Sequence, residues 1–421
     1  MSGDMGKLSD VAKVQSGFAF KSRDWRGDGV PVIKIQNVRA GRVKLEGCSY
    51  VSDEVAVTAS RYRLYRGDVL VTMSGEIGSV GVVRTDEHLL LNQRVGRIVL
   101  VDPDAAEIRY IAYALQDPCI KSMMEAIAYG TAQPNISPTL IGSLPLWLPP
   151  RATQTAIANV LEAFDDLIEN NRRRVEVLEE MARAIYREWF VKFRYPGHGD
   201  VPMVDSALGP IPEGWHVGRV GSFGRIVTGA TPSTKQPRYW GEAHDTPFLT
   251  PTEMGWRRLY ARPARHLSDA GVASVKSRLL PAGAVCFSSI GSIGKVTLAV
   301  KPLVTNQQVN SVVVDHSVTS ESYVYEALSH ASERIRGMAS GSATPIINKS
   351  TFADIRMVMT PPSLAHLFGR EVGLLHSLIT KLEEHSSRLG AIRDLLLPQL
   401  VTGQIDVSSL NLDTLIAEKV A

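Results

Sequence analysis

The chain contains the same ordered set of short motifs twice, and this internal repeat restricts its fold more than any other feature. Residues 74–80, Ser-Gly-Glu-Ile-Gly-Ser-Val, recur as residues 290–296, Ile-Gly-Ser-Ile-Gly-Lys-Val. The apolar run 31–38 recurs at the same offset as residues 247–254. Repeated motifs in a fixed order predict one fold used twice. Further downstream the matching pairs are Leu91-Asn92-Gln93 and Thr305-Asn306-Gln307, residues 130–136 and 341–347, and Pro149-Pro150 and Pro361-Pro362.

The composition is that of a folded protein without membrane spans. The chain has 421 residues, 44% of them hydrophobic and 21% charged, and this length suggests about three structural units. No apolar run approaches the roughly 18–20 residues of a membrane span, and residues 1–4 do not begin a signal peptide. Cys48, Cys119 and Cys286 lack metal-site spacing. We expect buried thiols without a metal in a reducing, cytoplasmic compartment.

Each repeat is predicted to be a mixed α/β module. Both copies alternate short β-rich runs with glycine, aspartate and serine, and each then contains a helical stretch. In the first module the predicted strands are 31–38, 69–73, 80–83 and 95–101, and the predicted helices are 108–115 and 120–127. In the second module the predicted strands are 285–288, 296–300 and 311–314, and the predicted helix is 322–338.

A long helical pattern follows each proline pair. Residues 154–194 contain no glycine or proline, which predicts a helix of about 40 residues and roughly 60 Å. Apolar residues spaced alternately three and four apart are typical of a coiled-coil seam. Asn171 and His385 are polar members at equivalent positions, and Asn171 either fixes the register or lies exposed where the helices separate. The predicted seam is Leu161, Phe164, Ile168, Asn171, Val175, Leu178 and Ile185 in the first helix, and Leu375, Leu378, Leu382, His385, Leu389, Ile392 and Leu396 in the second.

These patterns predict an α+β fold in which two mixed α/β domains are joined by two long helices. The helices are expected to form an antiparallel coiled coil, which gives a circular arrangement with an approximate internal two-fold axis. The glycine- and proline-rich stretch between the halves reads as a linker. The predicted division is 1–150, first domain; 151–195, central helix; 196–214, linker; 215–362, second domain; 363–421, C-terminal helix and tail.

No pattern of catalytic residues is present in the sequence. The chain contains no GxxxxGK[ST] phosphate loop, no Gly-x-Ser-x-Gly motif and no metal-spaced cluster of histidine and carboxylates. Thr360-Pro361-Pro362-Ser363 lacks the polar head and the aromatic residue of the motif that DNA amino-methyltransferases place beside the flipped base. We therefore expect a non-enzymatic chain that needs no cofactor.

The repeated motifs are glycine-rich turns flanked by side chains of the types that read base edges in a DNA groove. The apolar and glycine frame is kept between the copies, whereas several polar positions differ, as Gln36 does from Thr252. Two domains with the same backbone framework but different exposed polar side chains would read two different half-sites. The alternative is that these side chains cap turns. The candidate DNA-binding residues are Lys34, Gln36, Asn37, Ser74, Glu76, Ser79, Arg94, Gln133, Asn135, Thr250, Thr252, Glu253, Ser292, Lys295, Gln308 and Thr344.

Basic residues gather locally, although the net charge is only +3. Such clusters suit phosphate contacts at defined places, and the alternative is ordinary solvated surface. The first module contributes Arg61, Arg63 and Arg66, and the second contributes Arg257, Arg258, Arg262, Arg265, Lys276 and Arg278.

The ordered set of motifs resembles the specificity subunit of type I restriction–modification systems, over nearly the whole chain. One departure is the short opening at residues 5–8, which lacks the tryptophan that precedes the second module; residues 405–420 could complete the packing there. The motifs that carry the resemblance are residues 16–22, with 228–233 and 238–241 as their counterpart, the turns 130–134 and 341–345, and residues 181–186, 189–191, 209–215 and 396–405.

The resemblance implies two target recognition domains that each contact one half of a split double-stranded DNA site. It also implies helices that set the spacer length and dock two modification subunits, which supply methyl transfer, with restriction subunits that supply ATP-driven cleavage. Three alternatives remain: the same subunit in a methyltransferase-only system, a coiled-coil scaffold without a DNA role, and an enzyme with an unrecognised active site.

Overall fold

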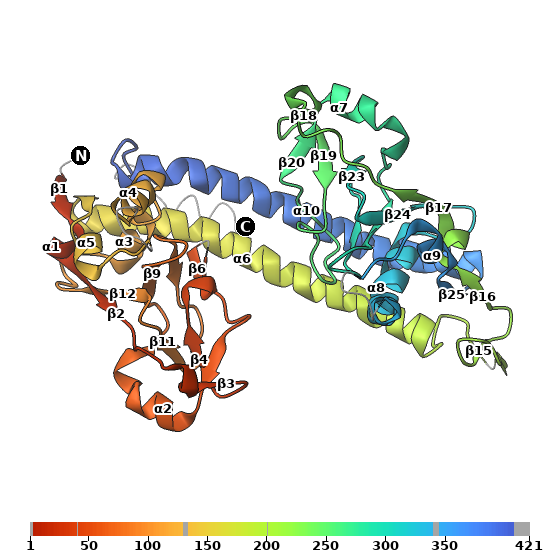
Figure 1. Cartoon of the computed structure of the whole chain (residues 1–421), viewed down its shortest axis with the longest axis horizontal. Helices are drawn as coiled ribbons and strands as arrows, with labels where there is room; N and C mark the ends of the chain where they lie inside the picture. The colour runs from red at the N-terminus through yellow and green to blue at the C-terminus, as the bar shows by residue number, and fades with distance from the viewer. Residues whose placement is uncertain (1–2, 40, 129–133, 200, 340–344, 408–421) are drawn as a thin grey trace. The chain divides into compact units, whose positions relative to one another are not determined.

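The computed structural model describes residues 3–39, 41–128, 134–199, 201–339 and 345–407. The chain divides into two compact units, each described by itself below (Figure 1). Unit 1 consists of Met1–Ile168 and Arg388–Ala421, and unit 2 consists of Glu169–Ser387. No helix in the described ranges has both the length and the apolar character that a membrane span requires. Of the three cysteines expected to be buried, Cys286 is buried, Cys48 is half-buried and Cys119 is exposed.

Unit 1 contains a six-stranded sheet of order β2-β12-β9-β10-β6-β5 and a five-stranded sheet of order β3-β7-β4-β11-β8. A separate strand pair, β1 and β13, is antiparallel. The strands are β1 (Asp4–Lys7), β2 (Ala12–Ser16), β3 (Trp25–Arg26), β4 (Val30–Ile33), β5 (Val38–Arg39), β6 (Gly41–Val43), β7 (Ser49–Val51), β8 (Arg63–Leu64), β9 (Val69–Thr72), β10 (Val80–Val82), β11 (Leu89–Leu91), β12 (Val95–Leu100) and β13 (Pro145–Leu148).

The helices of unit 1 cover opposite ends of these sheets. Figure 1 shows α3, α4 and α5 beside the first turns of α6, whereas α2 lies at the far end with β3 and β4. We call the five-stranded sheet together with α2 the outer lobe of unit 1. The helices are α1 (Leu8–Val11), α2 (Asp53–Thr58), α3 (Ile108–Ala114), α4 (Pro118–Ala128) and α5 (Pro138–Gly142).

Unit 2 repeats the plan with two four-stranded sheets of order β17-β24-β21-β22 and β18-β20-β19-β23. We call the second of these sheets together with α7 the outer lobe of unit 2. The elements are β14 (Met203–Val204), β15 (Ile211–Pro212), β16 (His216–Arg219), β17 (Gly224–Thr228), β18 (Trp240–Gly241), β19 (Thr246–Leu249), β20 (Arg265–Leu267), α7 (Asp269–Ser274), β21 (Val285–Ser288), β22 (Val296–Leu298), β23 (Val304–Thr305), β24 (Val309–Val314), α8 (Glu321–Met338), α9 (Lys349–Asp354) and β25 (Arg356–Met359).

The sheet topology confirms the predicted repeat of a mixed α/β module. The order β2-β12-β9-β10 in unit 1 corresponds to β17-β24-β21-β22 in unit 2. In the outer lobes the same central strands pair in parallel, β4 with β11 and β19 with β23. Unit 1 adds β5, β6 and β8 to this shared plan.

The apolar run 31–38 is shorter as a strand than its composition predicts. Strand β4 ends at Ile33, and a 3₁₀ turn follows at Ile35–Asn37. Asn37 causes the break, because its Oδ1 accepts a hydrogen bond from the N–H of Lys34 at 3.1 Å and its Nδ2 donates to the carbonyl of Lys44 at 3.0 Å. A side chain that bonds to nearby backbone competes with the strand ladder.

Two long helices, α6 (Arg151–Tyr186) and α10 (Pro362–Val401), contribute residues to both units. In unit 2 the two helices run in opposite directions. Asn171 Nδ2 lies 3.2 Å from His385 Nδ1, whereas the Trp189 ring, beyond the end of α6, lies 5.7 Å from the Phe368 ring near the start of α10. In unit 1, Arg393 Nη1 donates to Asp165 Oδ1 at 2.5 Å.

The buried stripe of α10 differs from the predicted seam. Leu378, His385 and Ile392 are exposed, whereas Ile379 and Ser386 are buried. Of the other predicted seam residues, Leu161, Asn171, Val175, Leu382 and Leu389 are buried, and Phe164, Ile168, Leu178, Ile185, Leu375 and Leu396 are half-buried.

This shift in α10 has a physical cause. The helix packs on α8 as well as on α6, and buried His376 places its Nε2 3.3 Å from Glu326 Oε1 of α8. Gly369 leaves room for Ser320, whose side chain would lie 2.6 Å from a Cβ at that position. A helix with two neighbours buries a wider stripe than the a/d seam of a two-stranded coiled coil.

The C-terminal end of α10 completes the core of unit 1. Leu397, Leu400, Val401 and Val407 are buried in the same cluster as Leu161. The Tyr110 hydroxyl donates to the carbonyls of Trp147 at 2.6 Å and Val401 at 3.3 Å. Residues 405–407 therefore supply packing to the first module, as expected from its short opening, and residues 408–420 lie outside the described ranges.

Candidate nucleic-acid interface

Loops from four parts of the first module converge at the end of β4. The N–H of Asn92 donates to the carbonyl of Ile33 at 3.1 Å, and the N–H of Met73 donates to that of Arg94 at 3.0 Å. The N–H of Ile136 donates to the carbonyl of Met73 at 2.9 Å. These bonds join the turns after β4, β9 and β11 and the segment before α5 into one loop cluster, which carries most of the candidate DNA-binding residues.

The second module forms the same loop cluster with the same backbone hydrogen bonds. The N–H of Asn306 donates to Leu249 at 3.1 Å, that of Ser289 to Gln308 at 2.7 Å, and that of Ile347 to Ser289 at 2.9 Å. Each bond corresponds to one in the first module, so the repeat extends to individual backbone groups. The two modules therefore present side chains from equivalent backbone positions.

In each loop cluster a glycine lies where two chain segments approach closely. A Cβ at Gly17 would lie 2.2 Å from the carbonyl oxygen of Leu91, and a Cβ at Gly229 would lie 2.2 Å from that of Thr305. No side chain fits at either place without moving backbone. These positions are the glycines of the opening motifs 16–22 and 228–233, so those motifs serve the close approach of two chain segments.

Six of the predicted residues are exposed at the tips of these clusters. Glu76 makes a loose ion pair with Arg39 at 3.7 Å, and Gln36 donates from Nε2 to the carbonyl of Gly47 at 2.8 Å. Since their remaining hydrogen-bonding groups face solvent, these side chains are available to a ligand. The exposed tips are Gln36, Glu76, Arg94 and Asn135 in the first module, and Thr252 and Ser292 in the second.

Other predicted residues form hydrogen bonds within the protein. Thr250 donates from its hydroxyl to Glu253 Oε2 at 2.6 Å, and Lys295 donates from Nζ to the carbonyl of Pro251 at 2.8 Å. Gln308 Oε1 accepts from Asn306 Nδ2 at 2.9 Å. Asn37 and Ser79 are buried, Lys34 and Ser74 are half-buried, and Gln133 and Thr344 lie outside the described residues.

Asn37 and Gln36 are neighbours that test whether a buried side chain supports the turn while an exposed one does not. Asn37→Ala removes three hydrogen bonds, to the backbone of Lys34, Lys44 and Glu46, from a side chain that is 1% exposed. We expect it to lower the free energy of unfolding by about 1–3 kcal/mol. Gln36→Ala, at an exposed side chain, should change it by less than about 0.5 kcal/mol. Urea unfolding measures both values, and equal losses would contradict this assignment.

Several arginines of the basic clusters form ion pairs within the protein, whereas Arg61, Arg63, Arg265 and Lys276 are exposed. In unit 2, Arg258 pairs with Glu176 at 3.1 Å and Glu179 at 3.5 Å, and Arg262 pairs with Glu383 at 2.6 Å. Through these ion pairs the segment after β19 contacts α6 and α10. Arg257 pairs with Glu333 at 3.3 Å, and in unit 1 Arg66 pairs with Asp86 at 3.2 Å.

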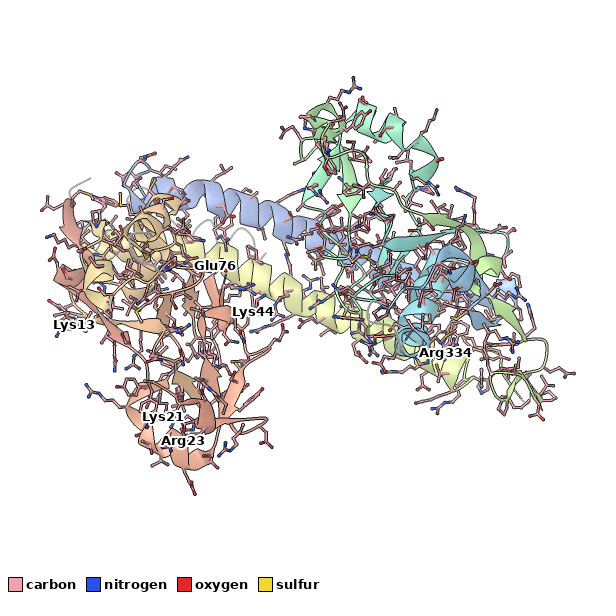
Figure 2. The ribbon with its side chains drawn as sticks, viewed as in Figure 1. Lys13, Lys21, Arg23, Lys44, Glu76 and Arg334 are labelled. Carbon is pink, nitrogen blue, oxygen red and sulfur yellow. The ribbon has the colours of Figure 1, made fainter. Side chains whose placement is uncertain are left out.

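Sequence reasoning missed an exposed lysine beside the first cluster. The N–H of Lys44 donates to the carbonyl of Asn37 at 2.7 Å, so its backbone is tied to the turn that carries Gln36. Figure 2 shows Lys44 and Glu76 on one side of unit 1, whereas Lys13 lies on the other. Lys44 closely follows Arg39 and Arg42 in sequence, so a search for clustered charge that included this stretch would find it. Its place just after the turn that carries Gln36 is a second signal.

Comparison with known proteins identifies the family. Residues 4–180 and 212–365 match the type I restriction modification DNA specificity domain, once in each half of the chain. The chain belongs to the type I specificity subunit family. Members of this family are non-catalytic and catalysis resides in other subunits, which confirms the expectation of a non-enzymatic chain.

Individual relatives agree with this assignment along the chain. The type I restriction enzyme HindI specificity subunit of Haemophilus influenzae is 26% identical over 330 residues, 65% of this chain and 71% of that protein. The MjaIX specificity subunit of Methanocaldococcus jannaschii is 23% identical over 414 residues, 97% of this chain and 94% of that protein. The crystal structure of the S subunit from M. genitalium shares the fold, with a TM-score of 0.58, 17% identity, and coverage of 95% of this chain and 96% of that one.

Proposed function

We propose that this specificity subunit recognises a bipartite double-stranded DNA site and that each module reads one half of it. Two modification subunits bind to it and supply methyl transfer, restriction subunits join the assembly, and the complex acts in the cytoplasm. Residues 1–150 and 215–362 are the target recognition domains of this proposal. The helices of segments 151–195 and 363–421 form an antiparallel coiled coil about an approximate two-fold axis, and 196–214 is the linker.

The observation that carries the proposal is that the two loop clusters share their backbone hydrogen bonds but differ in their exposed side chains. Hydrogen bonds such as Asn92 to Ile33 and Asn306 to Leu249 recur at 3.1 Å in both modules. The exposed residues on this frame differ: Gln36 corresponds to Thr252, and Glu76 corresponds to Ser292. Amide and carboxylate groups discriminate between base edges differently from hydroxyls. Two modules of this kind suit a site whose halves have different sequences.

An exchange of tips tests this proposal. Gln36→Thr together with Glu76→Ser gives the first module the corresponding side chains of the second. We expect methylation at the original site to fall by about tenfold or more, because a base contact contributes roughly 1–3 kcal/mol of discrimination. Sequencing of methylated DNA measures the change.

Only one half-site should change in that experiment. The converse variant, Thr252→Gln with Ser292→Glu, serves as its matched control and should change only the other half. A change in both halves from either variant would show that the modules do not read separately.

The helices are proposed to set the spacer length and to dock the modification subunits. A helix of 36 residues such as α6 is about 54 Å long. In unit 2 its outer side has exposed Val177, and α10 has exposed Leu374 and Leu378. An open hollow of about 320 Å³, lined by Val177, Leu178, Leu378 and two arginines, lies between them. Exposed apolar residues in such a hollow support a protein-docking role.

A further inference from the structure

Both outer lobes have a tryptophan at the same place on an edge strand. Trp25 of β3 pairs with Val51 of β7, and Trp240 of β18 pairs with Leu267 of β20. Strands β7 and β20 in turn pair with β4 and β19, so the two tryptophans occupy equivalent positions in the two sheets.

A cation lies over the ring of each tryptophan. In unit 1, Lys34 Nζ is 3.5 Å from the centroid of the Trp25 ring and donates to Ser49 Oγ at 2.7 Å. In unit 2, Arg265 Cζ is 4.8 Å from the centroid of the Trp240 ring and 5.1 Å from that of Phe248. Each cation and its tryptophan form a cation–π pair.

The two cations come from different positions of the shared fold. Strand β4 pairs Val32 with Ser49, whereas β19 pairs Phe248 with Arg265. Ser49 therefore corresponds to Arg265, and Lys34 corresponds to Thr250. In unit 1 the positive charge comes from the residue after β4, and in unit 2 it comes from β20. In both units it lies over the tryptophan ring. Such a compensated exchange indicates that the place of the charge matters more than the residue that supplies it.

These two cations are among the basic side chains of the modules that have no acidic partner within the described residues. Among the described residues, neither Lys34 nor Arg265 forms an ion pair with a carboxylate, whereas Arg66, Arg258 and Arg262 each do. A cation–π contact contributes about 0.5–1 kcal/mol at exposed sites and leaves the charge uncompensated. An anion can therefore bind to each of them.

Both cations lie beside the exposed tips. Lys34 directly precedes the turn Ile35–Asn37, and its N–H donates to Asn37 Oδ1 at 3.1 Å. Arg265 is paired with Phe248 on β19, which runs into the turn that carries Thr252. A duplex whose bases contact these tips would present backbone phosphates nearby, and phosphate contacts fix a protein's register on DNA.

We propose that Lys34 on Trp25 and Arg265 on Trp240 each bind one backbone phosphate, and thereby set the register of each module on its half-site. This inference rests on the proposed function. It gives Lys34, first considered as a base reader, a sequence-independent role, and it gives Arg265 the same role.

The salt dependence of DNA binding tests this inference. The full chain is assembled with its modification subunits, and its affinity for a random-sequence DNA duplex is measured over a range of salt concentrations. Lys34→Gln and Arg265→Gln should each reduce the slope of log K against log salt by about 0.9, and reduce affinity about fivefold near physiological salt. Lys13→Gln removes a charge from the other side of unit 1 and should change neither value.

A transfer of the cation is the sharper test. Lys34→Thr combined with Ser49→Arg gives the first module the arrangement of the second, and it should restore the slope that Lys34→Thr alone loses. If the transfer variant folds, as judged by thermal melting, and fails to restore the slope, the inference is overturned. If it does not fold, Lys34→Gln decides, and an unchanged slope overturns the inference. If the wild-type complex has no sequence preference at any salt concentration, the proposed function itself fails.

Discussion

Val175→Glu is expected to lower the free energy of unfolding by about 3–5 kcal/mol, because it places a charge in a core without a partner. Val175 is 1% exposed and belongs to the cluster that joins α6 to α10 and to the second module. A buried carboxylate there has to remain protonated or disrupt the packing around it. Urea unfolding followed by circular dichroism measures the loss.

The matched control is two residues away on the same helix. Val177 is 59% exposed, so Val177→Glu should change stability by less than about 0.5 kcal/mol. Because Val177 lines the proposed docking hollow, this variant should weaken binding of a modification subunit while the chain stays folded. Equal destabilisation by the two variants would mean that α6 does not bury the face described here.

Glu179→Ala is expected to cost about 2–4 kcal/mol, because it leaves buried polar groups without their acceptor. Glu179 is 6% exposed, and its Oε1 accepts the N–H of Leu259 at 3.0 Å while its Oε2 lies 3.5 Å from Arg258 Nη1. These contacts hold the segment after β19, and with it the second module, on α6. Glu180→Ala is the control, since Glu180 is exposed on the same helix and pairs with Arg183 and Arg187.

The pH dependence of stability gives a second readout for Glu179. Burial raises the pKa of its carboxyl above the ordinary value of 4.5, although Leu259 and Arg258 act in the opposite direction. The folded state therefore binds this proton more tightly than the unfolded state, and stability falls as pH rises from the unfolded pKa through the raised folded pKa. Glu179→Gln keeps an acceptor for Leu259 and should abolish this part of the pH dependence. A profile identical to that of the wild type would contradict the assignment.

The strands and the repeat could be predicted because they follow from local patterns. The strands at 69–72 and 285–288 are buried and mostly apolar, and both precede the glycine turns of the repeated motif. The turn at Asn37 could not be predicted from hydrophobicity, because an apolar run conceals the effect of one amide side chain on the backbone around it.

The seam of α10 shows where periodicity is insufficient. Leu378 and Ile379 are equally apolar, yet Leu378 is 37% exposed and Ile379 is fully buried. The choice between them depends on α8, which lies far away in sequence and contributes Glu326 as the partner of His376. Spacing along one helix contains no information about a second neighbour.

Charge clustering was a poor guide to the candidate interface for a related reason. Arg258 and Arg262 are consecutive basic residues in a loop, but their carboxylate partners, Glu176, Glu179 and Glu383, are on helices distant in sequence. Lys34 and Arg265 were both candidates from the sequence, but their shared place over a tryptophan is recognisable only once the strand pairing is known. Four exposed tips, Gln36, Thr252, Glu76 and Ser292, do lie at polar positions at which the two copies differ, whereas Ser79 and Lys295 differ and are not exposed.

The most direct test is to determine the DNA site of the wild-type complex by sequencing the DNA that it methylates. Two short specified blocks, separated by a fixed number of bases without preference, are expected if each module reads one half. A single uninterrupted recognition sequence, or methylation without sequence preference, would contradict the account of two separate readers on one repeated frame.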